Sequence, residues 1–346
     1  MSYRVLTELL YFCEINNFTV QSMDEDNQSL KFVVFGVGGA GCNSISRLAK
    51  SDFKDAKLVA FNTDKKQLDT LPSNVRSVLL GASVTQGLGA GGDPLMGEKS
   101  ALSSKLLIQK EAEGADLVFI LAGMGGGTGT GASPVIAQIA RDAGALVLGF
   151  VYFPFKLERS RTKKAQRGIS KLTDACDSLV LIENDRLVDW AQNVPIEQAF
   201  AMADDVAAKA VSGISKTILN PSLMSIDFAD LKSIAKDGGL AMISHGHSYG
   251  HMKVADIADA VLNNPLLGVD SSKATGALVH FTGGPELRLG DATEAGELLM
   301  AKLPDSVNVC WGARMEDTHK DSLEAFVIFT GIPSPLLLDP DTFSDA

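Results

Sequence analysis

The chain has little of what identifies several common classes of protein. Its four cysteines are scattered and form no C-x-x-C pair, so the sequence predicts neither a disulfide framework nor a structural zinc site. Lys and Arg total 31 against 42 Asp and Glu, and the net charge of −11 disfavours binding to nucleic acid or directly to anionic lipid. No apolar run approaches the roughly 18 residues of a membrane span, and the first residues lack a signal-peptide pattern. We therefore expect a cytoplasmic protein with no nucleic-acid partner and no direct membrane insertion, so that contact with a membrane needs an adaptor.

Strands and helices alternate from Lys31 onward, which is typical of a mostly parallel sheet wound by helices. Pro195 precedes a long helix with apolar residues at three-and-four spacing, and Asn220-Pro221 ends it. Because 346 residues exceed the usual size of one core, we predict an α/β fold in which a mostly parallel-sheet nucleotide-binding domain is joined by this central helix to a smaller α+β domain. The predicted boundaries are an N-terminal extension at 1–30, the nucleotide-binding domain at 31–195, the central helix at 196–220, the second domain at 221–332 and a short tail at 333–346.

Short apolar runs and helical periodicity predict the individual elements. Strands are expected at 31–35, 57–61, 117–122, 146–152, 178–182, 240–244, 276–282, 307–313 and 325–330. Helices are expected at 43–50, 132–140, 254–262 and 292–302, with a turn at 36–41.

A glycine-rich run, Gly125–Gly131, lies between an apolar strand and a helix and contains five glycines in seven residues. A turn without side chains at this place directs several backbone N–H groups to one point, beside the positive end of a helix dipole. That point suits a phosphate, whereas a merely connecting turn seldom needs more than one or two glycines. The chain has no G-x-x-x-x-G-K-[ST] motif, which argues against a P-loop enzyme.

A second glycine turn, Gly36–Gly41, follows the first strand and satisfies G-x-G-x-x-G. Alone it is compatible with a nicotinamide dinucleotide site in which Asp64 holds the ribose, and hence with an oxidoreductase. Together with the first run it favours one polyphosphate held from two sides. A third loop, Gly87–Pro94, either contacts the terminal phosphate or is a mobile surface loop. Asp64, at the carboxyl end of a strand, is a candidate Mg²⁺ ligand, directly or through water.

Eight segments in this order closely resemble the FtsZ family of the tubulin/FtsZ GTPase superfamily, and the resemblance runs from about Lys31 to about Gly331. The segments are Gly36–Asn43, Phe61–Asp64, Gly87–Pro94, Ala122–Gly131, Pro154-Phe155 with Glu158, Asn184–Leu187, Phe200 with Asp204, and Ile226–Leu231.

The resemblance implies a GTPase that binds GTP or GDP with Mg²⁺, assembles head to tail into filaments with copies of itself and serves cell division, recruited to mid-cell or another membrane site by an adaptor. Phe200 is then expected to stack on guanine, Asp204 and Asn184 to bond its edge, and Glu158 to bind the ribose. Core packing for Phe200 and a solvated surface charge for Glu158 are the structural alternatives. The residues that the family pattern assigns to the nucleotide are Gly38, Gly39, Ala40, Gly41, Asn43, Asp64, Gly91, Gly92, Gly123, Met124, Gly125, Gly126, Gly127, Thr128, Gly129, Thr130, Gly131, Pro154, Glu158, Arg161, Asn184, Phe200 and Asp204.

Asp227 and Asp230 correspond to the family's synergy loop, in which two carboxylates project from one subunit onto the γ-phosphate of its neighbour. The resemblance thus implies that this pair positions the attacking water after assembly. The structural alternative is that both acids cap the positive end of a helix that begins near Asp230.

Several positions depart from the family pattern and put the rate of hydrolysis and the metal geometry in question. Lys65, Asp93 and Ser225 replace a small residue, an Asn and an Asn, and Thr162 stands where the family has an arginine, for which Arg161 or Lys163 can substitute. The tail shows no long linker ending in an adaptor-binding peptide, so a divergent paralogue with another cytoskeletal task, or a polymer that only retains nucleotide, stays open. His245, His247 and His251 form H-x-H-x-x-x-H, for which an exposed polar loop is favoured over a zinc site because no fixed carboxylate is expected nearby.

Overall fold

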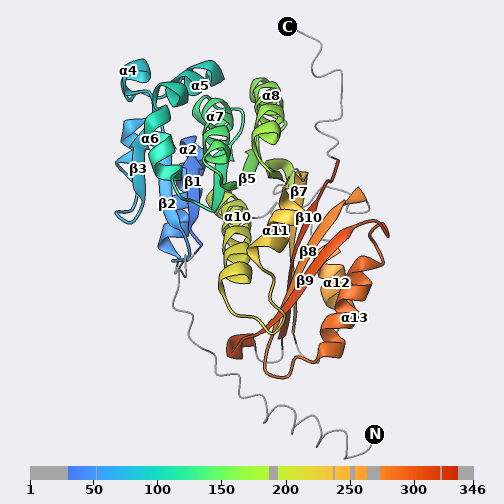
Figure 1. The fold of residues 1–346 in the computed structure, drawn as a ribbon. Coiled ribbons are helices and arrows are strands. Elements are labelled where there is room, and N and C mark those ends of the chain that lie inside the picture. Colours follow the sequence, from blue (N-terminus) through green and yellow to red (C-terminus); the bar gives the residue numbers. More distant parts are fainter. Residues whose placement is uncertain are drawn as a thin grey trace, which may run out of the picture. The chain divides into compact units, whose positions relative to one another are not determined.

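The computed structural model describes residues 30–51, 53–186, 194–236, 238–249, 254–262, 273–319 and 322–333. From Lys31 onward the chain forms a compact unit built on a ten-stranded sheet, with the strand order β3-β2-β1-β4-β5-β6-β7-β10-β8-β9 (Figure 1). The strands are β1 Phe32–Val37, β2 Lys57–Asn62, β3 Arg76–Leu79, β4 Leu117–Gly123, β5 Leu146–Phe153, β6 Ser178–Glu183, β7 Gly239–Tyr249, β8 Gly276–Gly283, β9 Asn308–Met315 and β10 Ser322–Thr330.

The helices are unevenly distributed between the two halves of the chain. In the first half they are α2 Gly38–Lys50, α3 Lys65–Leu68, α4 Ala82–Thr85, α5 Pro94–Ser103, α6 Lys105–Ala112, α7 Thr128–Asp142 and α8 Arg159–Ala175. In the second half they are α10 Ile196–Leu219, α11 Phe228–Ala235, α12 Val254–Leu262, α13 Leu289–Met300 and the 3₁₀ turn η2 Asp317–His319.

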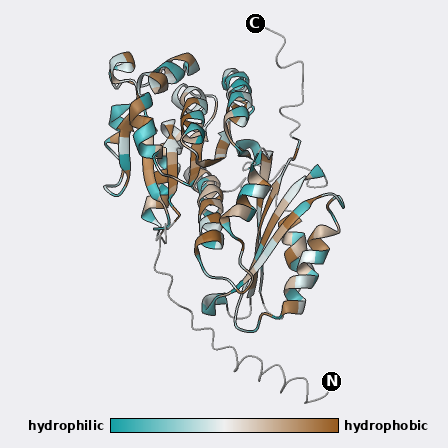
Figure 2. Ribbon diagram, viewed as in Figure 1, coloured by the Kyte–Doolittle hydropathy of each residue, from teal (hydrophilic) through white to brown (hydrophobic). Residues whose placement is uncertain are grey.

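The strands from β3 to β6 are parallel, as the alternation of elements predicts. All residues of β1 and β5 are buried, because helices cover both faces of this part of the sheet. Figure 2 shows the matching pattern, with predominantly hydrophobic central strands and a largely hydrophilic outer helix α8. Since the sheet is parallel here, the carboxyl ends of β1, β2, β4, β5 and β6 meet at one edge, where open α/β sheets bind ligands.

The second half of the sheet is mixed. β7 continues the parallel order beside β6 through three residue pairs, β10 is antiparallel to β7 and β8, and β9 is parallel to β8. A separate hydrophobic cluster, which includes Val261, Phe281 and Leu299, packs α12 and α13 against these strands. The sheet is continuous across the predicted domain boundaries, which remain predictions.

The long helix predicted after Pro195 is present as α10, which ends immediately before Asn220. Its 24 residues span roughly 36 Å at 1.5 Å per residue. Val211 and Ile214 are buried on one of its faces. None of the helices in the described part of the chain has the length and apolar character that a bilayer crossing requires.

Three predictions about local structure are wrong. The turn expected at 36–41 is absent, because β1 extends to Val37 and α2 begins at Gly38. The strand expected at 240–244 is the longer β7, because alternation of buried and more exposed residues continues through its polar end. The third error is omission: β3, α3, α4, α5 and α6 were not predicted.

Candidate functional site

A pocket of about 1150 Å³ lies at the carboxyl edge of the parallel strands. Its volume is slightly above the range of about 300–1,000 Å³ that is usual for small-molecule sites, and most of its wall comes from segments singled out in the sequence. The residues that line it are Gly39, Ala40, Asn62, Thr63, Asp64, Gln67, Gly89, Gly92, Gly123, Met124, Gly126, Gly127, Thr128, Gly129, Tyr152, Pro154, Phe155, Leu157, Glu158, Arg161, Asn184, Val194, Ala199 and Phe200.

The glycine-rich run forms the floor of the pocket. β4 ends at Gly123 and α7 begins at Thr128, so only the residues between them form the bend. Gly125 has a φ of +94°, a left-handed conformation that favours glycine, and its N–H donates to the Thr130 hydroxyl at 2.7 Å. Gly126 has no such strain, and a Cβ there would meet no heavy atom within 4 Å. The bend is therefore fixed at Gly125 and open to a ligand at Gly126.

Two helices begin at this floor, side by side. A Cβ on Gly38, the first residue of α2, would lie 2.7 Å from the backbone nitrogen of Gly129 in α7. The N-cap residues Val37 and Gly127 have no side chain that can accept a hydrogen bond from the first turn. Two uncapped helix N-termini thus point their positive ends at one place, which is a favourable environment for phosphate.

The third loop closes another side of the pocket through Gly89 and Gly92. The Gly89 N–H donates to the Thr63 carbonyl at 3.1 Å, and the Lys164 ammonium donates to the Gly92 carbonyl at 2.7 Å. Asp93 caps α5 by accepting from the Leu95 N–H at 3.0 Å. The loop is thus tied to β2 and to α8, in contrast with the free surface loop that was the alternative.

Asp64 lines the pocket at the carboxyl end of β2 and also caps α3. Its Oδ1 accepts from the N–H groups of Lys66 at 2.9 Å and Gln67 at 3.4 Å. No group of three or more metal-ligating side chains occurs among the residues that the structure describes. Mg²⁺ commonly uses one or two carboxylates together with phosphate oxygens and water, so a single pocket carboxylate fits such a site.

Phe200 and Glu158 also line the pocket. Phe200 is 42% exposed and meets the ring of Phe155 edge-on, with centroids 5.8 Å apart. Glu158 accepts from the Phe155 N–H at 3.2 Å and pairs with Arg161 at 2.7 Å. Phe200 is therefore not a core residue. Glu158 lines the pocket and has a cationic partner there.

Asp204 lies outside the pocket lining, on the α10 face that contacts α2. It accepts from the Ser44 hydroxyl at 2.6 Å and from Arg47 Nε at 3.4 Å. Burial raises the pKa of Asp204, and the hydrogen bonds from Ser44 and Arg47 offset this only in part. Burial and the Asp204 carboxylate together raise the pKa of Tyr152, whose hydroxyl lies 3.0 Å from Ser44 Oγ. Tyr152 lines the pocket, so Asp204 lies directly behind its wall.

The pocket brings together most of the nucleotide residues predicted from the sequence and adds others. Except for Gln67, Tyr152 and Val194, the added residues lie inside the segments named in the sequence or next to them, so membership of a segment or proximity to it was the available signal. The added residues are Asn62, Thr63, Gln67, Gly89, Tyr152, Phe155, Leu157, Val194 and Ala199. The predicted residues outside the lining are Gly38, Gly41, Asn43, Gly91, Gly125, Thr130, Gly131 and Asp204.

Asp227 and Asp230 do not line the pocket and instead form a reciprocal capping box on α11. The Asp230 N–H donates to Asp227 Oδ1 at 2.8 Å, and the Asp227 N–H donates to Asp230 Oδ2 at 3.0 Å. Both hydrogen bonds are at the exposed surface. The two acids therefore do cap a helix, as the structural alternative predicts, although α11 begins at Phe228 and not near Asp230.

The histidine pattern belongs to a strand and not to an exposed loop. His245 and His247 lie in β7, while His251 lies outside the described residues. His245 Nε2 is 2.8 Å from Glu324 Oε1, and His319 Nε2 is 3.0 Å from Glu324 Oε2. Burial alone raises the pKa of Glu324, but hydrogen bonds from the two histidines outweigh it and lower the pKa to about 2. A fixed carboxylate therefore accompanies these histidines, contrary to expectation.

Comparison with known proteins identifies the family. The GTPase-domain model of the tubulin/FtsZ family matches residues 31–192, and the model of the FtsZ family's C-terminal domain matches residues 239–333. The chain is 43% identical over 327 residues to cell division protein FtsZ 2 of Methanocaldococcus jannaschii, covering 94% of this chain and 86% of the relative. For FtsZ 2 of Haloferax volcanii the identity is 42% over 328 residues, with 95% and 82% covered.

Solved structures agree. An FtsZ dimer of M. jannaschii, without ligand, matches with a TM-score of 0.80 and 36% identity over 96% of this chain and 93% of that chain. CetZ2 of H. volcanii, at 23% identity and a TM-score of 0.73, shares the fold. These matches replace the oxidoreductase interpretation of the first glycine turn. The chain belongs to the tubulin/FtsZ family and is a GTPase with the FtsZ type of C-terminal domain.

Proposed function

We propose that the protein binds GTP with Mg²⁺ in the pocket, assembles head to tail with copies of itself, and completes hydrolysis with Asp227 and Asp230 of the neighbouring subunit. The observation that carries this proposal is the separation of the two parts of the site within one chain. The pocket offers phosphate-binding N–H groups, whereas the acid pair is exposed elsewhere and does not line it.

Phosphoryl transfer requires alignment and charge stabilisation more than covalent work by the protein. The N-termini of α2 and α7 and the bend at Gly125–Gly127 would hold the phosphate oxygens, and the loop at Gly89–Gly92 would approach the terminal phosphate. Asp64 would hold Mg²⁺ directly or through water, and the metal would neutralise charge on the phosphates. The neighbour's carboxylates would then orient the attacking water.

Among the other residues that line the pocket, we assign Phe200 to stacking on guanine, Glu158 to the ribose, and Asn184 to the base edge. Asp204 would accept from guanine N1–H and N2–H₂ once its bonds to Ser44 and Arg47 rearrange, and adenine lacks that donor pair. The exposed ring of Phe200 and the partly buried carboxylate behind Tyr152 support these assignments. Arg161, which is paired with Glu158, would take the place of the arginine that the family has at the position of Thr162.

We infer a role in cell division, in the cytoplasm, with recruitment to mid-cell or another membrane site by an adaptor protein. The support comes from the relatives: two with 43% and 42% identity are named cell division proteins, and one solved relative is a dimer.

The test replaces Asp227 by Asn. Asn caps helices about as well as Asp, so Asp227→Asn should leave α11 and filament formation intact while GTP turnover falls at least about tenfold. The control for loss of a capping carboxylate elsewhere is Asp291→Asn, because Asp291, in the first turn of α13, accepts from the Arg288 N–H at 3.2 Å, as Asp230 accepts from the Asp227 N–H. Turnover per sedimented subunit is measured for both, and wild-type turnover in Asp227→Asn would overturn the assignment.

A further inference from the structure

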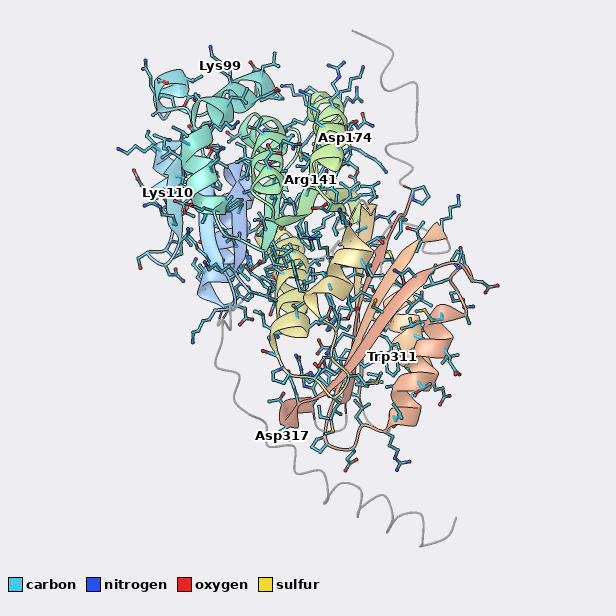
Figure 3. The ribbon with its side chains drawn as sticks, viewed as in Figure 1. Lys99, Lys110, Arg141, Asp174, Trp311 and Asp317 are labelled. Carbon is cyan, nitrogen blue, oxygen red and sulfur yellow. The ribbon has the colours of Figure 1, made fainter. Side chains whose placement is uncertain are left out.

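The segment between α10 and α11, residues 220–227, lies against β9, whose position among the second-half strands is marked by Trp311 in Figure 3. Met224 and Ala313 exchange two backbone hydrogen bonds of 3.1 Å each. Ile226 is buried, and a Cβ on Gly312 would lie 2.9 Å from its Cγ1, so glycine at this position lets the segment approach the strand. The free edge of β9 thus supports the approach to Asp227.

β9 also contacts the acid pair itself. Cys310 Sγ lies 3.9 Å from Asp230 Oδ1, on the side of β9 that faces α11. Asp227 and Asp230 are otherwise bonded to each other through the capping box. Their position in space depends on α11, whose Leu231 and Ile234 are buried, and on how the segment that precedes it is held. The described part of the chain shows no other hydrogen bond or ion pair of these two carboxylates.

Arg314 bonds to the last turn of α10, from which the same segment starts. Its Nη1 donates to the Lys216 carbonyl in the last turn of α10 at 3.1 Å, and its Nη2 donates to Glu316 Oε1 at 2.7 Å. The same carbonyl accepts from the Asn220 N–H at 3.1 Å, which ends the helix. A cation at a helix C-terminus complements the negative end of the dipole, and the planar guanidinium can satisfy both partners at once.

Arg314 is only 9% exposed, and burying a charge is costly unless its partners repay it. Closing the end of α10 is possible without a buried cation, because water or a helix-capping turn can satisfy the last carbonyls. The feature specific to this place is the geometry. Gly312 and Ala313 contact the segment that precedes Asp227, and the next residue, Arg314, bonds to the last turn of the helix from which that segment starts.

We propose that Arg314 is a positioning residue for GTP hydrolysis. It fixes the C-terminal turn of α10 against β9, so that the segment delivers Asp227 and Asp230 in one orientation to the neighbouring subunit. Arg314 itself is not among the residues that line the pocket. The inference rests on the proposed function, because it assigns a role only if the two acids act on the neighbour's nucleotide.

The test is Arg314→Gln, with Arg314→Lys as the conservative variant and Arg288→Gln as control for loss of an exposed arginine in the same half of the chain. A displaced catalytic group commonly costs tenfold to a hundredfold in rate. We expect Arg314→Gln to lower turnover per sedimented subunit about tenfold or more while GTP affinity of the unassembled subunit changes less than about twofold. Lysine can satisfy one of the two partners, so Arg314→Lys should be intermediate, and Arg288→Gln should equal wild type.

A double-mutant cycle with Asp227→Asn distinguishes a role that acts through the acid pair from a purely structural role. If Arg314 acts through the acid pair, Arg314→Gln should cause no further loss of turnover in the Asp227→Asn background. If the two substitutions act independently, their losses of turnover multiply, and this result would overturn the inference. If Asp227→Asn lowers turnover and Arg314→Gln does not, the inference alone fails. If Asp227→Asn retains turnover, the proposed function fails first. Should Arg314→Gln not fold, Arg314→Lys carries the same cycle, and unchanged turnover in it contradicts the role.

Discussion

At Gly126 the requirements of folding and those of nucleotide binding differ. A Cβ at this position meets nothing within 4 Å, and the residue is not among those with positive φ. The empty protein therefore does not need glycine here, and only a ligand approaching the backbone does. Gly126→Ala should leave the free energy of unfolding unchanged or raise it by about 0.4–1 kcal/mol, because alanine reduces the entropy of the unfolded chain.

The same methyl group should weaken GTP binding. It occupies pocket space beside the backbone, and losing one hydrogen bond to a charged phosphate costs about 1.5–3 kcal/mol, or roughly tenfold to a hundredfold in Kd. Gly126→Asp should weaken binding further, since two unit charges about 4 Å apart repel by about 4 kcal/mol at an effective dielectric constant of 20.

The assay is urea unfolding with and without GTP. At GTP equal to 100 times the wild-type Kd, binding should stabilise the wild type by about 2.7 kcal/mol, and a hundredfold weaker Kd should reduce this to about 0.4 kcal/mol. The control is Gly129→Ala, in which the new methyl collides with the Gly123 carbonyl and should destabilise the protein without ligand. Wild-type stabilisation of Gly126→Ala by GTP, or destabilisation without GTP, would refute the reasoning.

Three further predictions concern specificity, pH and packing. Asp204→Asn should lose at least about tenfold in affinity for GTP and favour xanthosine triphosphate, whose O2 accepts from the new amide; unchanged selectivity in competition binding would contradict this. Burial first, then the charge of Arg314, lowers the pKa of His280 to about 4 in the folded protein. As pH falls below 6.5, His280 therefore takes up a proton in the unfolded chain but not in the folded protein. Wild type should therefore lose about 1.4 kcal/mol more than His280→Asn between pH 7.5 and 5.5, and parallel losses in urea unfolding would argue otherwise. Gly131→Ala places a methyl group onto the Pro94 carbonyl of α5 and should cost about 1–3 kcal/mol, so an unshifted urea midpoint would show that the helices can separate freely.

The parallel half of the fold was predictable because its strands are short apolar runs between glycine turns. β4, β5 and β6 begin where the sequence predicts them, and each extends by one residue. The helices α5 and α6 were missed for a physical reason. Leu95, Leu102 and Leu106 are exposed there, so their apolar residues do not mark a buried face.

The site was less predictable than the fold. The glycine-rich run indicates a phosphate from chemistry alone, whereas no local pattern distinguishes Phe200 from a core residue, and only the family resemblance did so. Tyr152 is the penultimate residue of a fully buried strand, and nothing along the chain indicates that its side chain borders the pocket. The support of the synergy segment by Arg314 is also invisible in sequence, because nearly a hundred residues separate Arg314 from Lys216.

The central claim is that one subunit's pocket is completed by the next subunit's acid pair. The most direct test is the rate of GTP hydrolysis per subunit as a function of protein concentration, with Mg²⁺ and saturating GTP. We predict negligible hydrolysis below a threshold concentration and a superlinear rise of the total rate above it, which Asp227→Asn abolishes without moving the sedimentation threshold. A rate per subunit that is constant from the lowest concentration, and the same in both proteins, would contradict the account.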